Sequence, residues 1–213
     1  MTRSVTITKV IGFYKCLTGI VIEVRTVENV NKQEIIQRAI QNLISEFRVT
    51  PNKFLTEEDL RCYLYSLLLG DYGRLKKTKD DGKSISLHSE VRWYGNTGKL
   101  RLRSDLVILD VSSLETNEKD MKLKLPSKGY SFDGFFAIIE IKMRRIKGYS
   151  DNKFVDAVNK DRNKILAIRR ESEPFANSFW SYIVICDKKH NMNLKPSQSD
   201  KHKELYVFAR PAT

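Results

Sequence analysis

Cysteine is scarce in this chain, and long apolar runs are missing. The three cysteines, Cys16, Cys62 and Cys186, are odd in number and widely separated, which argues against a disulfide framework or a zinc site. No run approaches the roughly 18 apolar residues of a membrane span, and the first residues lack the apolar segment of a secretory signal. We therefore expect a soluble, intracellular protein without a membrane partner, in which the cysteines are buried apolar side chains.

Signatures of phosphate-binding loops and of nucleophilic hydrolases are also absent. The chain contains neither GxxxxGK followed by Ser or Thr nor GxGxxG, so NTP hydrolysis and dinucleotide binding have no support. Its three histidines, His88, His190 and His202, are scattered and form no zinc or histidine-rich nuclease motif. Serine-nucleophile and Cys/His hydrolase arrangements are likewise without support.

Positive charge is in excess. The chain has 38 Lys and Arg residues against 26 Asp and Glu residues, which gives a net charge of +12 and a pI near 9.6. Such a surface favours a polyanionic partner, because contacts with phosphates release condensed counterions. Nucleic acid is the leading candidate, although the charge alone does not separate DNA from RNA or from an anionic membrane.

The apolar patterns predict a single α/β domain, because 213 residues suffice for one substantial core and nothing in the composition demands a second. We divide it into a hairpin and helix extension at 1–54, a core at 55–186, and a C-terminal loop and strand at 187–213. Expected helices begin near 31, 57 and 152, and expected strands cover 4–26 (a hairpin), 85–94, 99–110, 135–143, 180–186 and 205–209.

Local signals predict the ends of the second helix. Thr56 and Asp59 have the spacing of a capping box, which starts a helix at Glu57. Gly70 suits a left-handed C-terminal residue and predicts that the helix ends at Leu69. The polar, lysine-rich stretch 72–83 that follows is expected to be a mobile loop.

The segment 137–142, Ala-Ile-Ile-Glu-Ile-Lys, is an apolar strand that carries a carboxylate and an ammonium group two residues apart. Because strand side chains alternate, Glu140 and Lys142 project to one face of the sheet, and Ile139 and Ile141 to the other. Burying an ion without a partner costs on the order of several kcal/mol, and a metal ion or a bound phosphate is one way to compensate it. Asp105, inside the apolar half of strand 100–109, is the natural partner of this segment.

Ser104-Asp105 followed by Glu140-Ile141-Lys142 resembles the motif of the PD-(D/E)XK nuclease superfamily, the restriction-endonuclease-like group that includes archaeal Holliday junction resolvases. Ser104 replaces the usual proline, and the loop between the two strands is long, a change that loops tolerate. The resemblance covers about 55–186 and implies a three-layer α/β/α sandwich on a central mixed sheet. It also implies a nuclease, and it would suit an archaeal or viral source.

The resemblance further implies a metal site and roles for its residues. Phosphodiester hydrolysis needs an activated water and a cation near the oxygens that gain charge, and Asp and Glu oxygens suit Mg²⁺ or Mn²⁺. The metal ligands would be the carboxylates of Asp105 and Glu140 and the main-chain carbonyl of Ile141. Lys142 would orient or polarise the attacking water and stabilise the transition state.

Weaker candidates surround this motif. Glu90 and Glu57 match places where family members carry a further acidic residue, and a surface or capping role is the alternative for each. Lys164 lies in the family's downstream element, and both a contact with the scissile phosphate and an ordinary solvated lysine stay open. The residues expected to bind nucleic acid are Lys164, Lys160, Arg162, Arg169 and Arg103, with the lysines of the loop at 76–79.

The preferred hypothesis is thus a metal-dependent endonuclease acting on duplex or branched DNA. One alternative is a nucleic-acid-binding protein that keeps the nuclease fold without cleaving. The other is a basic RNA-binding or structural protein with an accidental motif, which requires Asp105 and Glu140 to lie far apart. The sequence is also compatible with a homodimer, since two strands are often cleaved by two copies of one site.

Overall fold

The computed structural model describes residues 27–94, 100–116, 130–171, 179–189, 194–199 and 201–209. The hairpin expected at 4–26 and the turn expected at 95–98 lie outside the described residues, as do Cys16 and His190.

A six-stranded mixed sheet forms the centre of the molecule. Its strand order is β3-β4-β7-β8-β10-β9, in which β7, β8 and β10 are parallel and the other neighbours are antiparallel. The strands are β3 (Leu87–Tyr94), β4 (Leu100–Leu109), β7 (Phe135–Arg144), β8 (Trp180–Asp187), β9 (Gln198–Ser199) and β10 (His202–Phe208). Two small two-stranded sheets pair β1 (Lys76–Lys77) with β2 (Lys83–Ser84), and β5 (Leu114–Glu115) with β6 (Ser131–Phe132).

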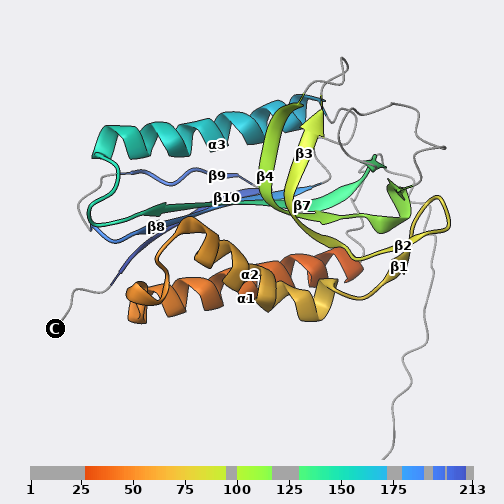
Figure 1. Cartoon of the computed structure of the whole chain (residues 1–213), viewed down its shortest axis with the longest axis horizontal. Coiled ribbons are helices and arrows are strands. Elements are labelled where there is room, and N and C mark those ends of the chain that lie inside the picture. Colours follow the sequence, from red (N-terminus) through yellow and green to blue (C-terminus); the bar gives the residue numbers. More distant parts are fainter. Residues whose placement is uncertain are drawn as a thin grey trace, which may run out of the picture.

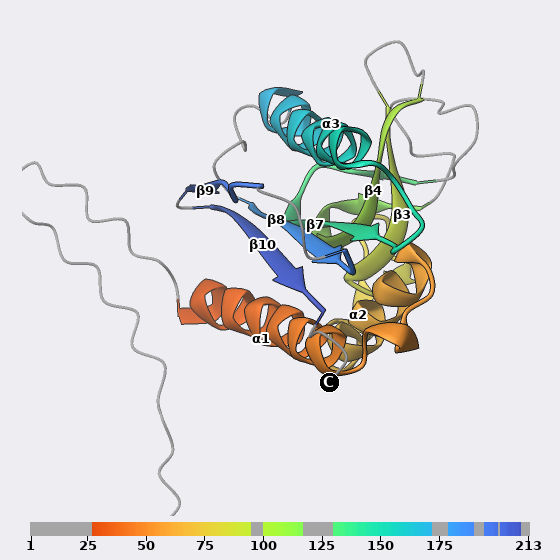
Figure 2. The same cartoon turned by 90° about the vertical axis from the view of Figure 1, so that its left-hand side faces the viewer.

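Helices cover both faces of the sheet. Helices α1 (Val27–Val49) and α2 (Glu57–Tyr72) lie together on one face, with the short helix η1 (Pro51–Lys53) between them, and α3 (Asp151–Glu171) lies on the other (Figures 1 and 2). The short helix η2 (Val111–Ser113) follows β4. The expected α/β class, with a mixed sheet between helical layers, is therefore confirmed. No helix in the described ranges has the length and apolar character needed to cross a membrane.

Alternation along β7 divides its side chains between two cores. Ile139 and Ile141 pack in the larger core with α1 and α2, whereas Ile138 packs in a core that includes Ile168 of α3. Glu140 is bound by a lysine of α3, so its carboxylate projects to the same side as Ile138. The period of two expected from the sequence is therefore present, and it places a charged residue inside the sandwich.

The capping box at the start of α2 is confirmed, but the predicted end of the helix is wrong. Thr56 Oγ1 accepts a hydrogen bond from the Asp59 backbone at 3.2 Å, and Asp59 Oδ2 accepts one from the Thr56 backbone at 2.8 Å. The helix continues past Gly70 because Tyr72 extends the buried stripe and donates its hydroxyl to Lys32 O at 2.9 Å. Burial of that aromatic ring outweighs the roughly 1 kcal/mol cost of a helical glycine.

Three further expectations need correction. Helix α1 begins at Val27 rather than near residue 31, and the expected loop at 72–83 contains most of the β1–β2 hairpin. Of the described cysteines, Cys186 is buried as expected, but Cys62 is exposed on α2 and contacts Glu58 Oε1 at 3.4 Å. Amphipathic spacing assigns a residue to a helix face only approximately, and Cys62 lies just outside the buried stripe of α2.

Candidate active site

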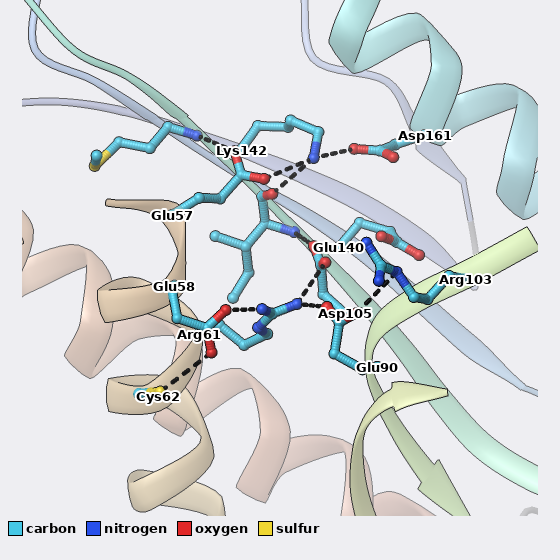
Figure 3. Close-up of polar contacts among 12 residues, drawn as sticks. Glu57, Glu58, Arg61, Cys62, Glu90, Arg103, Asp105, Glu140, Lys142 and Asp161 are labelled. Carbon is cyan, nitrogen blue, oxygen red and sulfur yellow. Dashed lines mark hydrogen bonds and ion pairs between the residues drawn. The ribbon is translucent and has the colours of Figure 1, made fainter. Parts of the chain in front are cut away.

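The predicted motif residues lie around a highly charged cavity where α2 and α3 approach β3, β4 and β7. The cavity has a volume of about 280 Å³. Its lining consists of Glu57, Glu58, Arg61, Glu90, Arg103, Asp105, Lys142 and Lys164. These side chains come from five separate elements, α2, β3, β4, β7 and α3, so the site exists only in the folded chain. Figure 3 shows Glu57, Arg61, Asp105 and Lys142 pointing toward one another.

Glu140 is a fully buried carboxylate with an incomplete set of partners. Its Oε2 accepts a hydrogen bond from Lys164 Nζ at 2.6 Å, whereas no described group hydrogen-bonds to the buried Oε1. Burial raises the pKa of Glu140 to about 8; Lys164 opposes this shift, and the nearby carboxylates of Asp105 and Asp161 add to it. An oxygen that is buried, unpartnered and close to other carboxylates is a suitable position for a cation.

Lys142 is a partly buried cation held between carboxylates. Its Nζ lies 2.9 Å from Glu57 Oε1 and 3.1 Å from Asp161 Oδ2, and it donates a hydrogen bond to Ile141 O at 3.1 Å (Figure 3). Burial by itself would lower the pKa of Lys142, but the carboxylates of Asp161, Glu57 and Asp105 raise it above its ordinary value. Lys142 is therefore protonated at neutral pH, and it can donate hydrogen bonds but cannot accept a proton.

Asp105 is fixed against the backbone of the motif strand. Its Oδ2 accepts a hydrogen bond from the Ile141 N–H at 2.8 Å. The β4–β7 register pairs Leu106 with Ile139, so the next position along the ladder sets Asp105 opposite Glu140. The structure thus brings Asp105, Glu140 and Lys142 together, which is the opposite of what an accidental motif requires.

Glu90 reaches the site through an unusual backbone conformation. Its φ of 55° is in the left-handed region, and such a conformation costs on the order of 1–3 kcal/mol for a residue other than glycine. The flanking pairs Ser89–Leu106 and Val91–Ser104 set Glu90 opposite Asp105 across the β3–β4 ladder. Its Oε2 binds Arg103 Nε at 2.8 Å, and its Oε1 forms an ion pair with Arg61.

Sequence reasoning missed Arg61, a cation that lies among several of the acidic side chains of the site. Arg61 lies on α2 one turn after Glu57, and its guanidinium contacts the carboxylates of Glu58, Glu90 and Asp105, the last at 3.3 Å. Its buried Nε has no hydrogen-bond partner among the described residues. The four-residue spacing from Glu57 was the available signal, because it places both side chains on one face of the helix.

Asp161 was also missed, although it lies in the segment that the sequence singled out. It is buried on α3 and binds both Lys142 and Lys164, the latter at 2.9 Å. An aspartate three residues before a lysine is normally read as an exposed helix ion pair, which hides its role as a bridge between the two site lysines.

The donor set fits a hard divalent cation with few protein ligands. Six carboxyl groups surround four cationic side chains, an excess of two acidic groups. They are Glu57, Glu58, Glu90, Asp105, Glu140 and Asp161 against Arg61, Arg103, Lys142 and Lys164. In the described part of the chain, no three His, Cys, Asp or Glu side chains converge as a ready-made metal cluster. Mg²⁺ needs only one or two protein carboxylates because it keeps several waters, so Asp105 and Glu140 are sufficient.

The residues expected to bind nucleic acid are in different environments. Arg162 forms two hydrogen bonds with the buried Glu204, at 2.7 and 2.6 Å. Arg169 covers the ring of Phe179 at 4.1 Å and hydrogen-bonds to Ser181 Oγ at 2.8 Å. Both guanidinium groups are thus engaged inside the fold. Lys160 is exposed, and Arg103 and Lys164 line the cavity.

Comparisons of the chain with family models, with curated proteins and with solved structures give no match.

Proposed function

We propose that this protein is a divalent-metal-dependent nuclease of the PD-(D/E)XK type, which hydrolyses phosphodiester bonds in DNA. The observation that carries the proposal is the buried Glu140 carboxylate, which has an unpartnered oxygen and lies opposite Asp105, two residues before a partly buried lysine. A carboxyl group with a pKa of about 8 is a poor structural anion. It becomes favourable when a cation compensates its charge.

In this proposal, Asp105, Glu140 and the carbonyl of Ile141 hold Mg²⁺ or Mn²⁺. When bound, the cation lowers the pKa of a water and neutralises charge on the phosphate oxygens. Lys142 is kept protonated by Glu57 and Asp161, so it donates hydrogen bonds to the attacking water or to the oxygens that gain charge. Lys164 keeps Glu140 in place and faces the cavity, where it is available to a phosphate.

A non-catalytic nucleic-acid-binding protein is the second candidate, and Arg61 favours it. The guanidinium already neutralises part of the negative charge that a metal would need, because it contacts Asp105 and Glu90. This candidate predicts DNA binding without metal binding or cleavage.

Two variants that separate metal binding from DNA cleavage test the proposal. Asp105→Ala should lose both Mn²⁺ affinity and cleavage. Lys142→Ala should keep Mn²⁺ binding and lose cleavage by about 10²-fold to 10³-fold, the usual effect of removing one pre-organised electrostatic contact. Calorimetric titration of Mn²⁺ and a plasmid-nicking assay with and without chelator measure the two properties.

Arg48→Ala is the control, because Arg48 is an exposed cation of α1, a helix that contributes no residue to the cavity lining. This variant should behave like the wild type in both assays. Cleavage that persists in chelator, or a Lys142→Ala protein as active as the wild type, would show that these residues are not a catalytic site.

A further inference from the structure

A second exposed surface lies at the end of β7, next to the candidate active site, and combines apolar and cationic side chains. Its apolar members are strongly exposed: Leu55 is 68%, Ile146 66% and Tyr149 56% accessible. We call it the β7–α3 surface; it consists of Leu55, Arg145, Ile146, Lys147, Tyr149, Lys188 and Lys189.

Hydrogen bonds hold the three segments of this surface together. Lys188 Nζ donates to Phe54 O at 2.6 Å, and Lys189 Nζ donates to Tyr149 O at 2.9 Å. The loop itself is a tight turn in which the Gly148 N–H donates to Arg145 O at 2.9 Å. A Cβ atom at Gly148 would lie 3.0 Å from that oxygen, so a larger residue would have to displace the backbone slightly.

Among the described residues, no carboxylate forms an ion pair with the cations of the β7–α3 surface, Arg145, Lys147, Lys188 and Lys189. Burial lowers the pKa of Lys188 and the charge of Arg145 lowers it further, while the carboxylate of Asp59 acts in the opposite direction. Such a group of cations favours an anionic partner.

The surface is continuous with the candidate active site. Arg145 comes directly after the end of β7, three residues beyond Lys142, a separation of roughly 10 Å in extended chain. Leu55 precedes Glu57 by two residues, and Glu57 Oε2 accepts a hydrogen bond from the Met143 N–H at 3.0 Å. A polymer whose backbone enters the cavity would therefore cross this surface.

We infer that the β7–α3 surface binds single-stranded nucleic acid, with unpaired bases against Tyr149 and Ile146 and phosphates against the four cations. This inference rests on the proposed nuclease function and specifies its substrate. A duplex offers phosphates to the cations but hides the faces of its bases, so the exposed apolar side chains gain nothing from it. A single strand offers both, because every unpaired base has a face that stacks on an aromatic ring.

Binding of single-stranded and duplex DNA tests the inference directly. A fluorescently labelled oligodeoxynucleotide, alone and annealed to its complement, is titrated with the full-length protein in chelator, and anisotropy is measured. Tyr149→Ala should weaken single-strand binding by about tenfold and change duplex binding by less than about twofold, as expected for the loss of one stacked base. Tyr149→Phe should retain wild-type affinity, because its ring still stacks.

Two controls separate stacking from charge. Leu166→Ala removes a half-exposed apolar side chain from α3, outside this surface, and should leave both affinities unchanged. Lys147→Ala should weaken both forms alike and reduce the salt dependence of binding, because its contact is with phosphate.

If Tyr149→Ala loses equal affinity for single-stranded and duplex DNA, or loses none, the inference is wrong. Plasmid cleavage by the wild type would still support the proposed function in that case. A wild-type protein that binds neither form would remove the DNA function and this inference together. A third outcome would also overturn the inference. If the wild type binds phosphatidylserine vesicles but not single-stranded DNA, and Tyr149→Ala abolishes the vesicle binding, the surface binds a membrane.

Discussion

Replacing Glu140 with glutamine should stabilise the metal-free protein at neutral pH. Glutamine keeps the shape of the side chain and has no proton to take up. Lys164 retains its ion pair with Asp161 at 2.9 Å, so the substitution leaves no isolated buried cation. The gain comes from removing a carboxyl group that the fold forces to remain protonated.

The magnitude follows from the raised pKa, about 8 against an ordinary value of 4.5. Below pH 4.5 the carboxyl group is neutral in the folded and unfolded states, and it has no effect on stability. As the pH rises toward 8, the unfolded state loses the proton first, and the stability of the wild type falls by about 1.4 kcal/mol per pH unit. The loss is about 3 kcal/mol at pH 7 and levels off above pH 8, where the folded state also ionises.

Urea denaturation between pH 5 and pH 8, in chelator, measures this effect through the unfolding free energy. Glu140→Gln should exceed the wild type by less than about 1 kcal/mol at pH 5 and by about 3 kcal/mol at pH 7, the latter equivalent to a melting temperature about 6 °C higher or more. Added Mn²⁺ should reduce the difference, because a bound cation favours the ionised Glu140 of the wild type.

Glu34→Gln provides the control, because Glu34 is exposed on α1. Its stability should follow the wild type at every pH. Parallel pH profiles for Glu140→Gln and the wild type, or a Glu140→Gln protein less stable at pH 7, would refute the reasoning from burial.

Two other substitutions test the surroundings of the site. Arg61→Met should tighten Mn²⁺ binding by about fivefold or more in calorimetry, because it removes a positive charge that contacts Asp105. Arg103→Met should have a smaller effect, because among the described residues Arg103 pairs only with Glu90. Weaker Mn²⁺ binding in Arg61→Met would show that Arg61 does not compete with the metal. Arg162→Ala should lower the unfolding free energy by about 3 kcal/mol in urea, because it leaves the buried Glu204 carboxylate without its cation. Hydrogen bonds from His202, Arg162 and the Ser197 backbone, which outweigh burial, lower the pKa of Glu204 to about 2, so this loss should persist down to about pH 4 and diminish below it. A stable Arg162→Ala protein with impaired DNA binding would instead place Arg162 at the nucleic-acid surface.

The sequence by itself determined the features that depend on near neighbours. The Thr56–Asp59 capping box fixed the start of α2, because both partners lie within one helical turn. The alternation of β7 set Glu140 and Ile138 toward one side and Ile139 toward the other, because successive side chains of any strand point to opposite faces. The apolar periods likewise gave the helices and the main strands of the sheet, with errors at their ends.

Only the tertiary structure decided which charges meet. Lys142 and Glu57 are 85 residues apart in the chain. The resemblance placed both near one site, but nothing in the local sequence showed that they form an ion pair. The fold also drew Arg61 into the acidic group and took Arg162 into an internal ion pair with Glu204. A charged residue on an amphipathic helix satisfies the local pattern whether it faces water or a buried carboxylate, so its partner is fixed only when distant elements pack together.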